Sequence, residues 1–253
     1  MKIAVCVKAV PDAAAGRRLD PTTKRLDRSV DLAISDFDTY AVEEALELRE
    51  AAGEGEVVVV SMGPERAMDA LRKALAMGAD RAVLVTDSAL EGADLLGTAN
   101  ALAGALEKEG PDLVLFGQQS ADGGGAVLWA AVAEKLRLPV ISQVSELTTG
   151  NGSVTGKRQT EFGYDSIRAP LPAVIAVSDA INTPRYPSLK GIMGAKKKPQ
   201  DTLSAADVGG AAGAGTTVVE LSPPPARGES RKIEDDGSAA EKIVEFLAEK
   251  RLV

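Results

Sequence analysis

The residues best suited to chemistry form a glycine-rich loop, residues 117–125, of sequence GQQSADGGG. The loop follows a short apolar run and precedes a predicted helix at 126–136. Glycines let the backbone approach a phosphate, a helix N-terminus adds partial positive charge, and Ser120 offers a hydroxyl donor. The spacing matches neither a Walker loop nor Gly-x-Gly-x-x-Gly, so it leaves two readings open, a nucleotide-phosphate loop or a tight strand–helix turn. Asp122 is unexpected beside a phosphate unless it caps the helix or accepts from a nearby amide.

The composition narrows the possible chemistry. The 253 residues include no histidine and one cysteine, Cys6. Without histidine there is no Ser-His-Asp triad and no imidazole base, and one cysteine cannot build a zinc or iron–sulfur cage. We find no convincing pair of catalytic carboxylates, and we expect neither catalytic residues nor a metal site in this chain. Any redox chemistry would therefore come from an organic cofactor.

The charge balance and the apolar runs bear on partners and compartment. The formal net charge of -8 argues against nucleic acid as a main partner. No apolar run reaches about 18 residues, so we expect no membrane insertion. The N-terminus enters a strand pattern without a leader-like stretch, and the lone Cys6 suits a reducing compartment. We expect a cytoplasmic protein.

The elements that would position the loop alternate between strands and helices. Short apolar runs and helical patterns follow one another at 3–7, 39–50, 57–60, 63–77, 82–85, 94–108, 113–116 and 126–136. This alternation predicts an α/β fold with a doubly wound, mostly parallel Rossmann-like sheet. In such sheets ligands bind at the carboxyl edge of the strands, where the glycine loop would lie.

The pattern changes after Pro139. Strand-like runs at 143–147, 153–159 and 167–168, with turn signals at 149–152 and 162–165, predict an antiparallel extension of the same sheet. Beyond Pro199 the chain is rich in glycine and proline, and an amphipathic helix follows at 239–250. We therefore expect an α/β domain over 1–199 and a linker with a C-terminal helical arm over 200–253.

Residues 182–199 look like a docking element. Pro184 and Pro187 interrupt regular pairing, three large apolar residues follow without strand alternation or a long helical repeat, and three consecutive lysines come next. An apolar tip on a stiffened loop beside a basic run is typical of docking. The alternative is a surface crossover with solvated lysines.

Residues 182–199, together with MKIAVCVK at 1–8 and LPAVIAV at 171–177, resemble the beta subunits of electron transfer flavoproteins. The resemblance implies an electron shuttle, without catalysis of its own, between flavin dehydrogenases such as the acyl-CoA dehydrogenases of fatty acid oxidation and the respiratory quinone pool. It implies a sheet of the adenine-nucleotide-binding type with a structural AMP in this chain. It also implies an alpha subunit holding most of a shared FAD, and a quinone-side oxidoreductase. The C-terminal arm would pack on the alpha subunit, and its docking on its own domain is the alternative.

The resemblance also implies which residues make the two sites. Cofactor binding would fall to Cys6, Ser35, Asp36, Phe37, Asp38, Met62, Gly117, Gln118, Gln119, Ser120, Asp122, Gly123, Gly124 and Gly125. Partner docking would fall to Tyr186, Leu189, Ile192, Met193 and Lys197.

The chain departs from the family pattern at two places. Residues 124–127 read GGAV where many relatives carry side-chain phosphate ligands, so backbone amides would do the binding, and residues 12–15 lack a tyrosine that some members place against the flavin. Two rival functions stay open. One is an electron-bifurcating, NADH-oxidising complex with a second FAD in this pocket, and the other is an adenine-nucleotide sensor without electron transfer.

Overall fold

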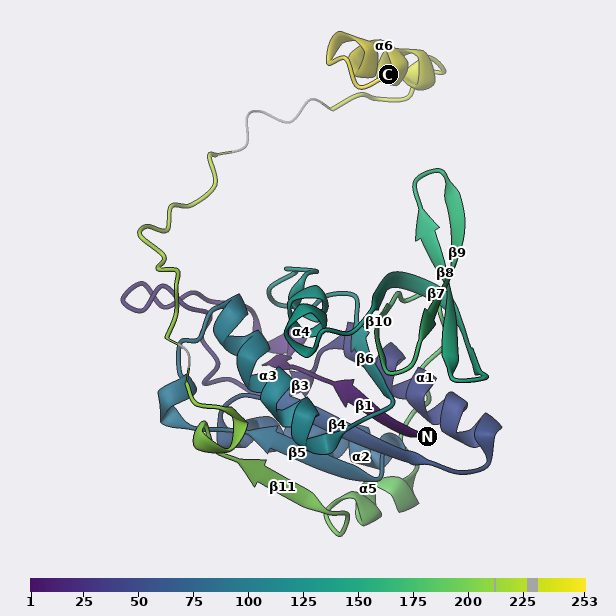
Figure 1. Cartoon of the computed structure of the whole chain (residues 1–253). Coiled ribbons are helices and arrows are strands. Elements are labelled where there is room, and N and C mark those ends of the chain that lie inside the picture. The colour runs from purple at the N-terminus through teal and green to yellow at the C-terminus, as the bar shows by residue number, and fades with distance from the viewer. Residues whose placement is uncertain (212, 227–231) are drawn as a thin grey trace. The chain divides into compact units, whose positions relative to one another are not determined.

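The computed structural model describes residues 1–211, 213–226 and 232–253. The chain forms two compact units, Met1–Val218 and Val219–Val253. The first is built on a nine-stranded sheet of order β11-β5-β4-β1-β6-β10-β7-β8-β9 (Figure 1). Its strands are β1 (Lys2–Cys6), β4 (Glu56–Met62), β5 (Arg81–Val85), β6 (Leu113–Gly117), β7 (Val140–Gly150), β8 (Ser153–Thr160), β9 (Gly163–Pro170), β10 (Ala173–Val177) and β11 (Gln200–Leu203). A small antiparallel sheet pairs β2 (Ala9–Pro11) with β3 (Leu32–Ile34).

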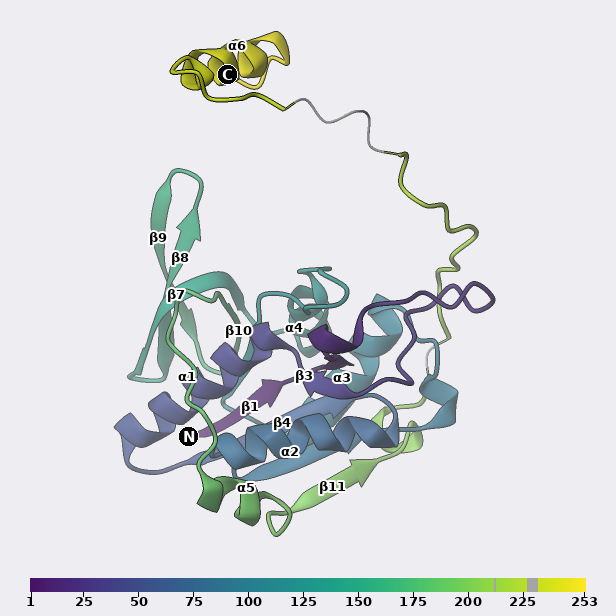
Figure 2. The same ribbon diagram turned by 180° about the vertical axis from the view of Figure 1, so that it is seen from behind.

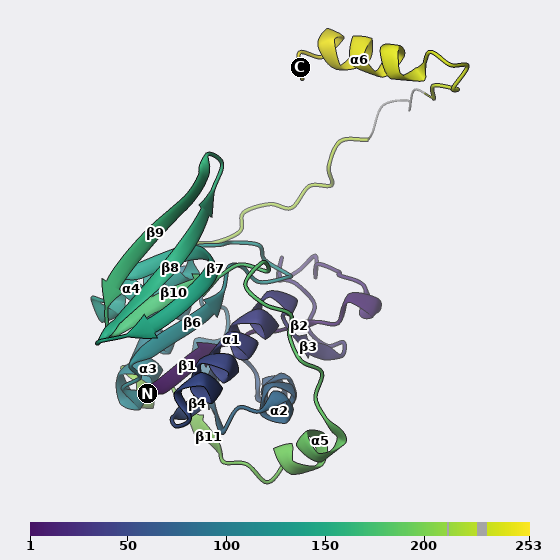
Figure 3. The ribbon, with the colours of Figure 1, turned by 90° about the vertical axis from the view of Figure 1, so that its right-hand side faces the viewer.

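Helices cover both faces of the large sheet, as Figure 3 shows. On one face lie α1 (Asp36–Ala52), α2 (Met68–Met77) and α5 (Leu189–Ala195), and on the other lie α3 (Leu95–Glu109) and α4 (Leu128–Leu136). Short 3₁₀ turns are η1 (Ala13–Ala15), η2 (Glu65–Ala67), η3 (Ser88–Leu90) and η4 (Ala206–Val208). Alternate residues of β1 enter two separate cores, Ile3 and Val5 on the α1 side and Ala4 and Cys6 on the α3 side. The predicted doubly wound α/β fold is confirmed.

The direction of winding reverses at β1 and β6. From β1 the chain moves outward through β4 to β5 and then returns over α3 to β6, on the other side of β1. Both strands are parallel neighbours, with Cys6 paired to Phe116. The ends of β1 and β6 therefore meet at a topological switch point, where open α/β sheets bind ligands.

The antiparallel extension is present but longer than its sequence signals. β7 pairs in parallel with β10 and then antiparallel with β8, with a bulge between Val144 and Glu146. The turn predicted at 149–152 forms between β7 and β8, with Asn151 and Gly152 at positive φ. The last strand was predicted at 167–168, but β9 begins at Gly163, because Thr160 and Gly163 already pair across a tight turn.

The sheet also continues past Pro199. Residues Gln200–Leu203 form β11, which pairs in parallel with β5 at the edge of the sheet, and the first compact unit runs to Val218. The sequence QDTL has no apolar alternation because an edge strand of this kind is half exposed, so its pattern resembles a linker.

In the second unit, α6 (Ala239–Glu249) is amphipathic and leaves Ile243 and Val244 exposed. Within 1–211, 213–226 and 232–253, no helix has both the length and the apolar character needed to cross a bilayer.

Candidate functional site

Four segments meet at the carboxyl edge of the sheet: the end of β1, the end of β4, the start of α1 and the glycine loop at 117–125. Ser35 precedes α1, but no described side chain caps that helix there. The Ser35 Oγ instead accepts a hydrogen bond from the backbone N–H of Ala121, at 3.1 Å. Ser35 therefore joins the start of α1 to the glycine loop.

Asp38 ties the two strands of the switch point together. Its buried carboxylate accepts the backbone N–H of Lys8 at 2.7 Å, and the N–H of Gly117 also hydrogen-bonds to it. Burial raises the pKa of Asp38 to about 7, although these N–H donors oppose the rise. The carboxylate thus lies under the site, where it links β1, β6 and α1.

Gly117 is the point of closest approach between the loop and α1. A Cβ atom at this position would lie 2.6 Å from the backbone carbonyl of Phe37 and 2.7 Å from the carboxylate of Asp38. Real Cβ contacts are not this short, so the absence of a side chain here allows α1 to start directly against β6.

Asp122 is the centre of an ion cluster that holds the loop. Its side chain is 1% exposed, and it pairs with the Lys8 ammonium at 2.8 Å and with the Arg28 guanidinium. Burial alone would raise the pKa of Asp122, but the hydrogen bonds and charges of Lys8 and Arg28 outweigh it and hold the pKa at about 2. The cluster leaves one net positive charge beside the loop.

Sequence reasoning missed both cations of this cluster. Lys8 follows the first apolar strand directly, so its place at the carboxyl edge was predictable from topology. Arg28 lies in a polar, turn-rich segment 94 residues from Asp122, and no periodicity points to it.

The rest of the loop is folded on itself and open to solvent. Ser120 accepts through Oγ from the N–H of Gly123, at 3.2 Å, and through its carbonyl from that of Gly124, at 3.0 Å. Ala126 has a φ of 49°, a left-handed conformation costly for a residue with a Cβ, so α4 begins at Leu128 rather than at the predicted 126. No described side chain caps α4, so its first amides are left to water or a ligand.

The remaining predicted site residues have mixed surroundings. Cys6 is buried, and burial followed by the nearby Asp38 charge raises the pKa of its thiol, so Cys6 is no nucleophile. The carbonyl of Gln118 accepts from the Trp129 indole at 3.1 Å. Gln119, Phe37 and Met62 are partly exposed, and Asp36, Gly123, Gly124 and Gly125 are exposed. The predicted residues therefore gather at one sheet edge.

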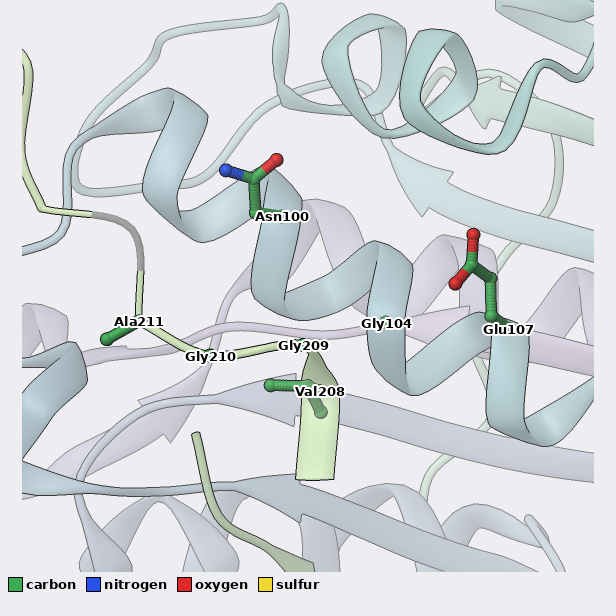
Figure 4. Close-up of a pocket in the computed structure, with 7 residues that line it drawn as sticks. All are labelled: Asn100, Gly104, Glu107, Val208, Gly209, Gly210 and Ala211. Carbon is green, nitrogen blue, oxygen red and sulfur yellow. The ribbon is translucent and has the colours of Figure 1, made fainter. Parts of the chain in front are cut away.

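A hollow of about 310 Å³ lies elsewhere, between α3 and residues 208–211 (Figure 4). Asn100 and Glu107 line it with side chains that point away from Val208. The backbone carbonyl of Val208 would lie 2.3 Å from a Cβ on Gly104, so the two elements pack closely there. Of the described residues that line the hollow, Glu107 alone is charged, and a carboxylate does not suit a phosphate, so we assign the hollow no site.

The predicted docking residues form a second surface, here called the docking patch and defined as Tyr186, Leu189, Ile192 and Met193. All four are exposed, Tyr186 at 96% and Leu189 at 80%. Leu189, Ile192 and Met193 share one face of the short helix α5. Their spacing in the sequence, i, i+3 and i+4, is that of a helix face, but a helix of seven residues is hard to recognise from sequence. Lys197 is exposed beside them, whereas the Lys198 ammonium donates to the carbonyls of Leu75 and Ala79.

The two surfaces lie at opposite edges of the sheet. After β10 the chain runs back along α1, where Asn182 donates to the carbonyl of Tyr40 and Arg185 contacts Glu50 near the helix end (Figure 2). α5 then packs against the end of α2, far from the strand ends that carry the glycine loop.

We expect Asp38→Asn to remove much of the pH dependence of stability between pH 5 and 8. The pKa of Asp38 is higher in the folded protein than in the unfolded chain, so the folded state binds this proton more tightly and loses stability as pH rises from about 4 to 7. For the parent, we expect this rise in pH to lower the free energy of unfolding by on the order of 2–4 kcal/mol, less whatever solvent relaxation around the buried carboxylate recovers. Urea unfolding at pH 5 and pH 8 measures it.

Two variants frame this experiment. Asp36→Asn changes an exposed carboxylate in the same turn, and its stability should depend on pH as that of the parent does. Glu44→Gln should remove a further part of the pH dependence of stability. Burial raises the pKa of Glu44 to about 7 as well, although a hydrogen bond from Asn182 opposes the rise. The site description is wrong if Asp38→Asn and the parent lose the same free energy between the two pH values.

Comparisons with known proteins agree over nearly the whole chain. A family profile described as electron transfer flavoprotein domain matches residues 23–208. A Mycobacterium tuberculosis protein named electron transfer flavoprotein subunit beta is 41% identical, over 99% of both chains, and one from Syntrophomonas wolfei is 40% identical, over 98% of this chain and 96% of the other. The caffeyl-CoA reductase-Etf complex subunit CarD of Acetobacterium woodii is 35% identical over the full length of both chains. The matched region contains both the glycine loop and the docking patch.

Proposed function

This chain belongs to the electron transfer flavoprotein beta-subunit family, and we propose that it carries electrons from flavin dehydrogenases, such as acyl-CoA dehydrogenases, toward the respiratory quinone pool. The observation that carries the proposal is the docking patch. Four large apolar side chains stand exposed on a segment whose flanks are fastened to α1 and α2. A contiguous exposed patch of large apolar side chains marks an interaction site.

The glycine loop at the switch point would hold AMP in a structural role. The residues present fit an adenosine monophosphate in two respects. The N–H groups of Gly123 and Gly124 bond to Ser120, but Gly125 is exposed beside the uncapped start of α4. Lys8 and Arg28 outweigh the charge of Asp122 by one. Bound AMP would stabilise the folded subunit by mass action.

We propose that FAD is shared with an alpha subunit that holds most of it and with which this chain forms a heterodimer. The flavin supplies the one- and two-electron chemistry, which no side chain of this subunit provides. The described residues contain no cluster of potential metal ligands. In the same proposal, α6 packs on the alpha subunit through Ile243 and Val244, and a quinone-side oxidoreductase accepts the electrons.

Docking through this patch would be weak and rapidly reversed. Burying one leucine is worth roughly 1.5–3 kcal/mol, whereas micromolar affinity needs about 8. A carrier that serves several donors requires such exchange. The buried thiol of Cys6 suits a reducing compartment, and we place the shuttle in the cytoplasm.

CarD is named as a subunit of a reductase-Etf complex, and this favours a larger assembly as a second candidate. In that candidate, another FAD lies at the glycine loop and the complex oxidises NADH. The glycine loop argues against it, because residues 124–127 offer backbone amides and no polar side chain for a longer ligand. An adenine-nucleotide sensor would leave the docking patch without a role.

We expect the complex co-purified with its alpha subunit to release one FAD and one AMP per heterodimer, identified by mass and counted against protein. Gly117→Val should release FAD but little AMP, because the side chain would collide with Phe37 and displace the loop. Two FAD and no AMP would support the second candidate. Failure to bind an alpha subunit, together with bound ATP, would contradict electron transfer altogether.

A further inference from the structure

The docking patch lies on residues 182–199, here called the docking segment, which is fastened on both sides. We propose that Arg185 is the residue that positions the patch, by fixing the start of this segment to α1, and that Lys198 fixes its end to α2. The consequence for docking rests on the proposed shuttle function, whereas the fastening itself does not.

Arg185 joins two carboxylates that lie seven residues apart on α1. Its backbone N–H donates to Glu43 at 3.0 Å and its Nε donates to both Glu43 oxygens at 2.9 Å. Its Nη1 and Nη2 donate to the two oxygens of Glu50, at 2.6 and 3.0 Å. Glu43 is 3% exposed, so removing Arg185 would leave a buried carboxylate without its ion-pair partner. A planar guanidinium can satisfy both carboxylates at once, and a lysine cannot.

The neighbouring groups make Arg185 hard to replace. Glu44 and Glu47 lie on the same part of α1, and the pKa of Glu47 is raised by slight burial and by the charge of Glu43. Arg185 is the cation that faces this acidic stretch from the docking segment, and its own pKa is raised by its hydrogen bonds to Glu50 and Glu43. Asn182 adds a hydrogen bond to Glu44 at 3.2 Å.

The far side of the segment is fixed to the end of α2. The Lys198 ammonium donates to the carbonyls of Leu75 and Ala79, at 2.9 and 2.5 Å, where a helix terminus has unpaired acceptors. Between the anchors, a Cβ on Gly191 would lie 2.3 Å from the carbonyl of Ala76, so α5 lies directly on the α2 backbone.

These anchors explain how an exposed patch keeps one shape. α5 has seven residues, too few to form a stable helix alone, and the face that carries the patch is in water. A partner that binds an already ordered patch avoids the entropy cost of ordering it. Loosening Arg185 should therefore weaken docking without changing the electron-transfer step that follows.

The test uses the complex with its alpha subunit and three variants: Arg185→Lys, Arg185→Ala and Lys108→Ala. Lys108 forms an exposed ion pair with Asp207, so Lys108→Ala changes the net charge by as much as Arg185→Ala does but should change little else. For both Arg185 variants we expect KM for an acyl-CoA dehydrogenase to rise about tenfold, with kcat and flavin content unchanged. Backbone amide exchange at 186–195 should accelerate by about tenfold, with or without a dehydrogenase.

Each outcome decides one claim. Equal amide exchange rates at 186–195 in the parent and in both Arg185 variants would show that Arg185 does not hold the docking patch in place. Faster exchange with an unchanged KM would show that the anchor does not serve docking. If the parent accepts electrons from no flavin dehydrogenase, the proposed function fails while the exchange data still decide the anchor. Arg185→Lys carries the test if Arg185→Ala fails to fold.

Discussion

Gly117→Ala lowers the free energy of unfolding of the first unit by about 3 kcal/mol and its melting temperature by roughly 6–12 °C, and it should release the AMP that we propose for the glycine loop. The added Cβ would lie 2.6 Å from the Phe37 carbonyl, which belongs to backbone that cannot rotate away. Relief requires moving the start of α1 away from β6, and that movement also pulls Asp38 from the N–H of Lys8. Calorimetry and nucleotide release measure both effects on one sample.

Gly125→Ala is the matched control for this prediction. Gly125 belongs to the same loop, its φ is not in the left-handed region, and no atom lies within 4 Å of an added Cβ. We expect its stability to stay within about 0.5 kcal/mol of the parent. Equal losses for both variants would mean that the loop tolerates no side chain anywhere, and that the contact between α1 and β6 is not the cause.

Leu189→Ala reduces kcat/KM for reduction by an acyl-CoA dehydrogenase about 10–100-fold, because most of one leucine's burial energy, roughly 1.5–3 kcal/mol, is lost from the docked complex. The side chain is 80% exposed in the subunit, so the folded protein loses little by its removal. Flavin content and thermal stability should match the parent. Stopped-flow reduction at several dehydrogenase concentrations separates KM from kcat.

Leu96→Ala provides the corresponding control. Leu96 is also an exposed leucine, but it lies on α3 outside the docking patch. Reduction of this variant should proceed at the parent's rate. A parent-like rate for Leu189→Ala would remove Leu189 from docking, and a slow rate for both variants would point to a general loss of apolar surface.

The sequence predicted the parts of the fold that carry strong periodicity. The apolar runs that became β1, β4, β5 and β6 are buried on both faces, so their patterns are nearly continuous and their order required a parallel sheet. β11 and α5 were not predicted as elements, because QDTL is half exposed and α5 has seven residues. β11 is held by its pairing with β5 and α5 by its packing on α2, so these tertiary contacts, and not the intrinsic secondary-structure propensity of the residues, determine both elements.

The candidate site was predictable to a similar degree. Topology placed the glycine loop at the carboxyl edge, and the resemblance supplied the residues around it. The role of Asp122 was not readable, because its partner Arg28 comes from a segment without periodicity. The anchors Arg185 and Lys198 were also missed, since a lysine run and a lone arginine usually indicate solvated surface, and only the folded chain brings Glu43, Glu50 and the end of α2 to them.

The path of α1 separates two kinds of change that this protein could undergo. Its 17 residues span about 25 Å, with Asp38 under the glycine loop at one end and the Arg185 contacts toward the other. The side chains of Arg185 and Lys198 lie outside residues 186–193, so the exposed residues of this stretch can be exchanged provided that Gly191, which lies on the α2 backbone, is kept. Under the proposed function, the surface that docks partners can therefore change between relatives, or be engineered, while the proposed nucleotide site at the other end of α1 stays the same.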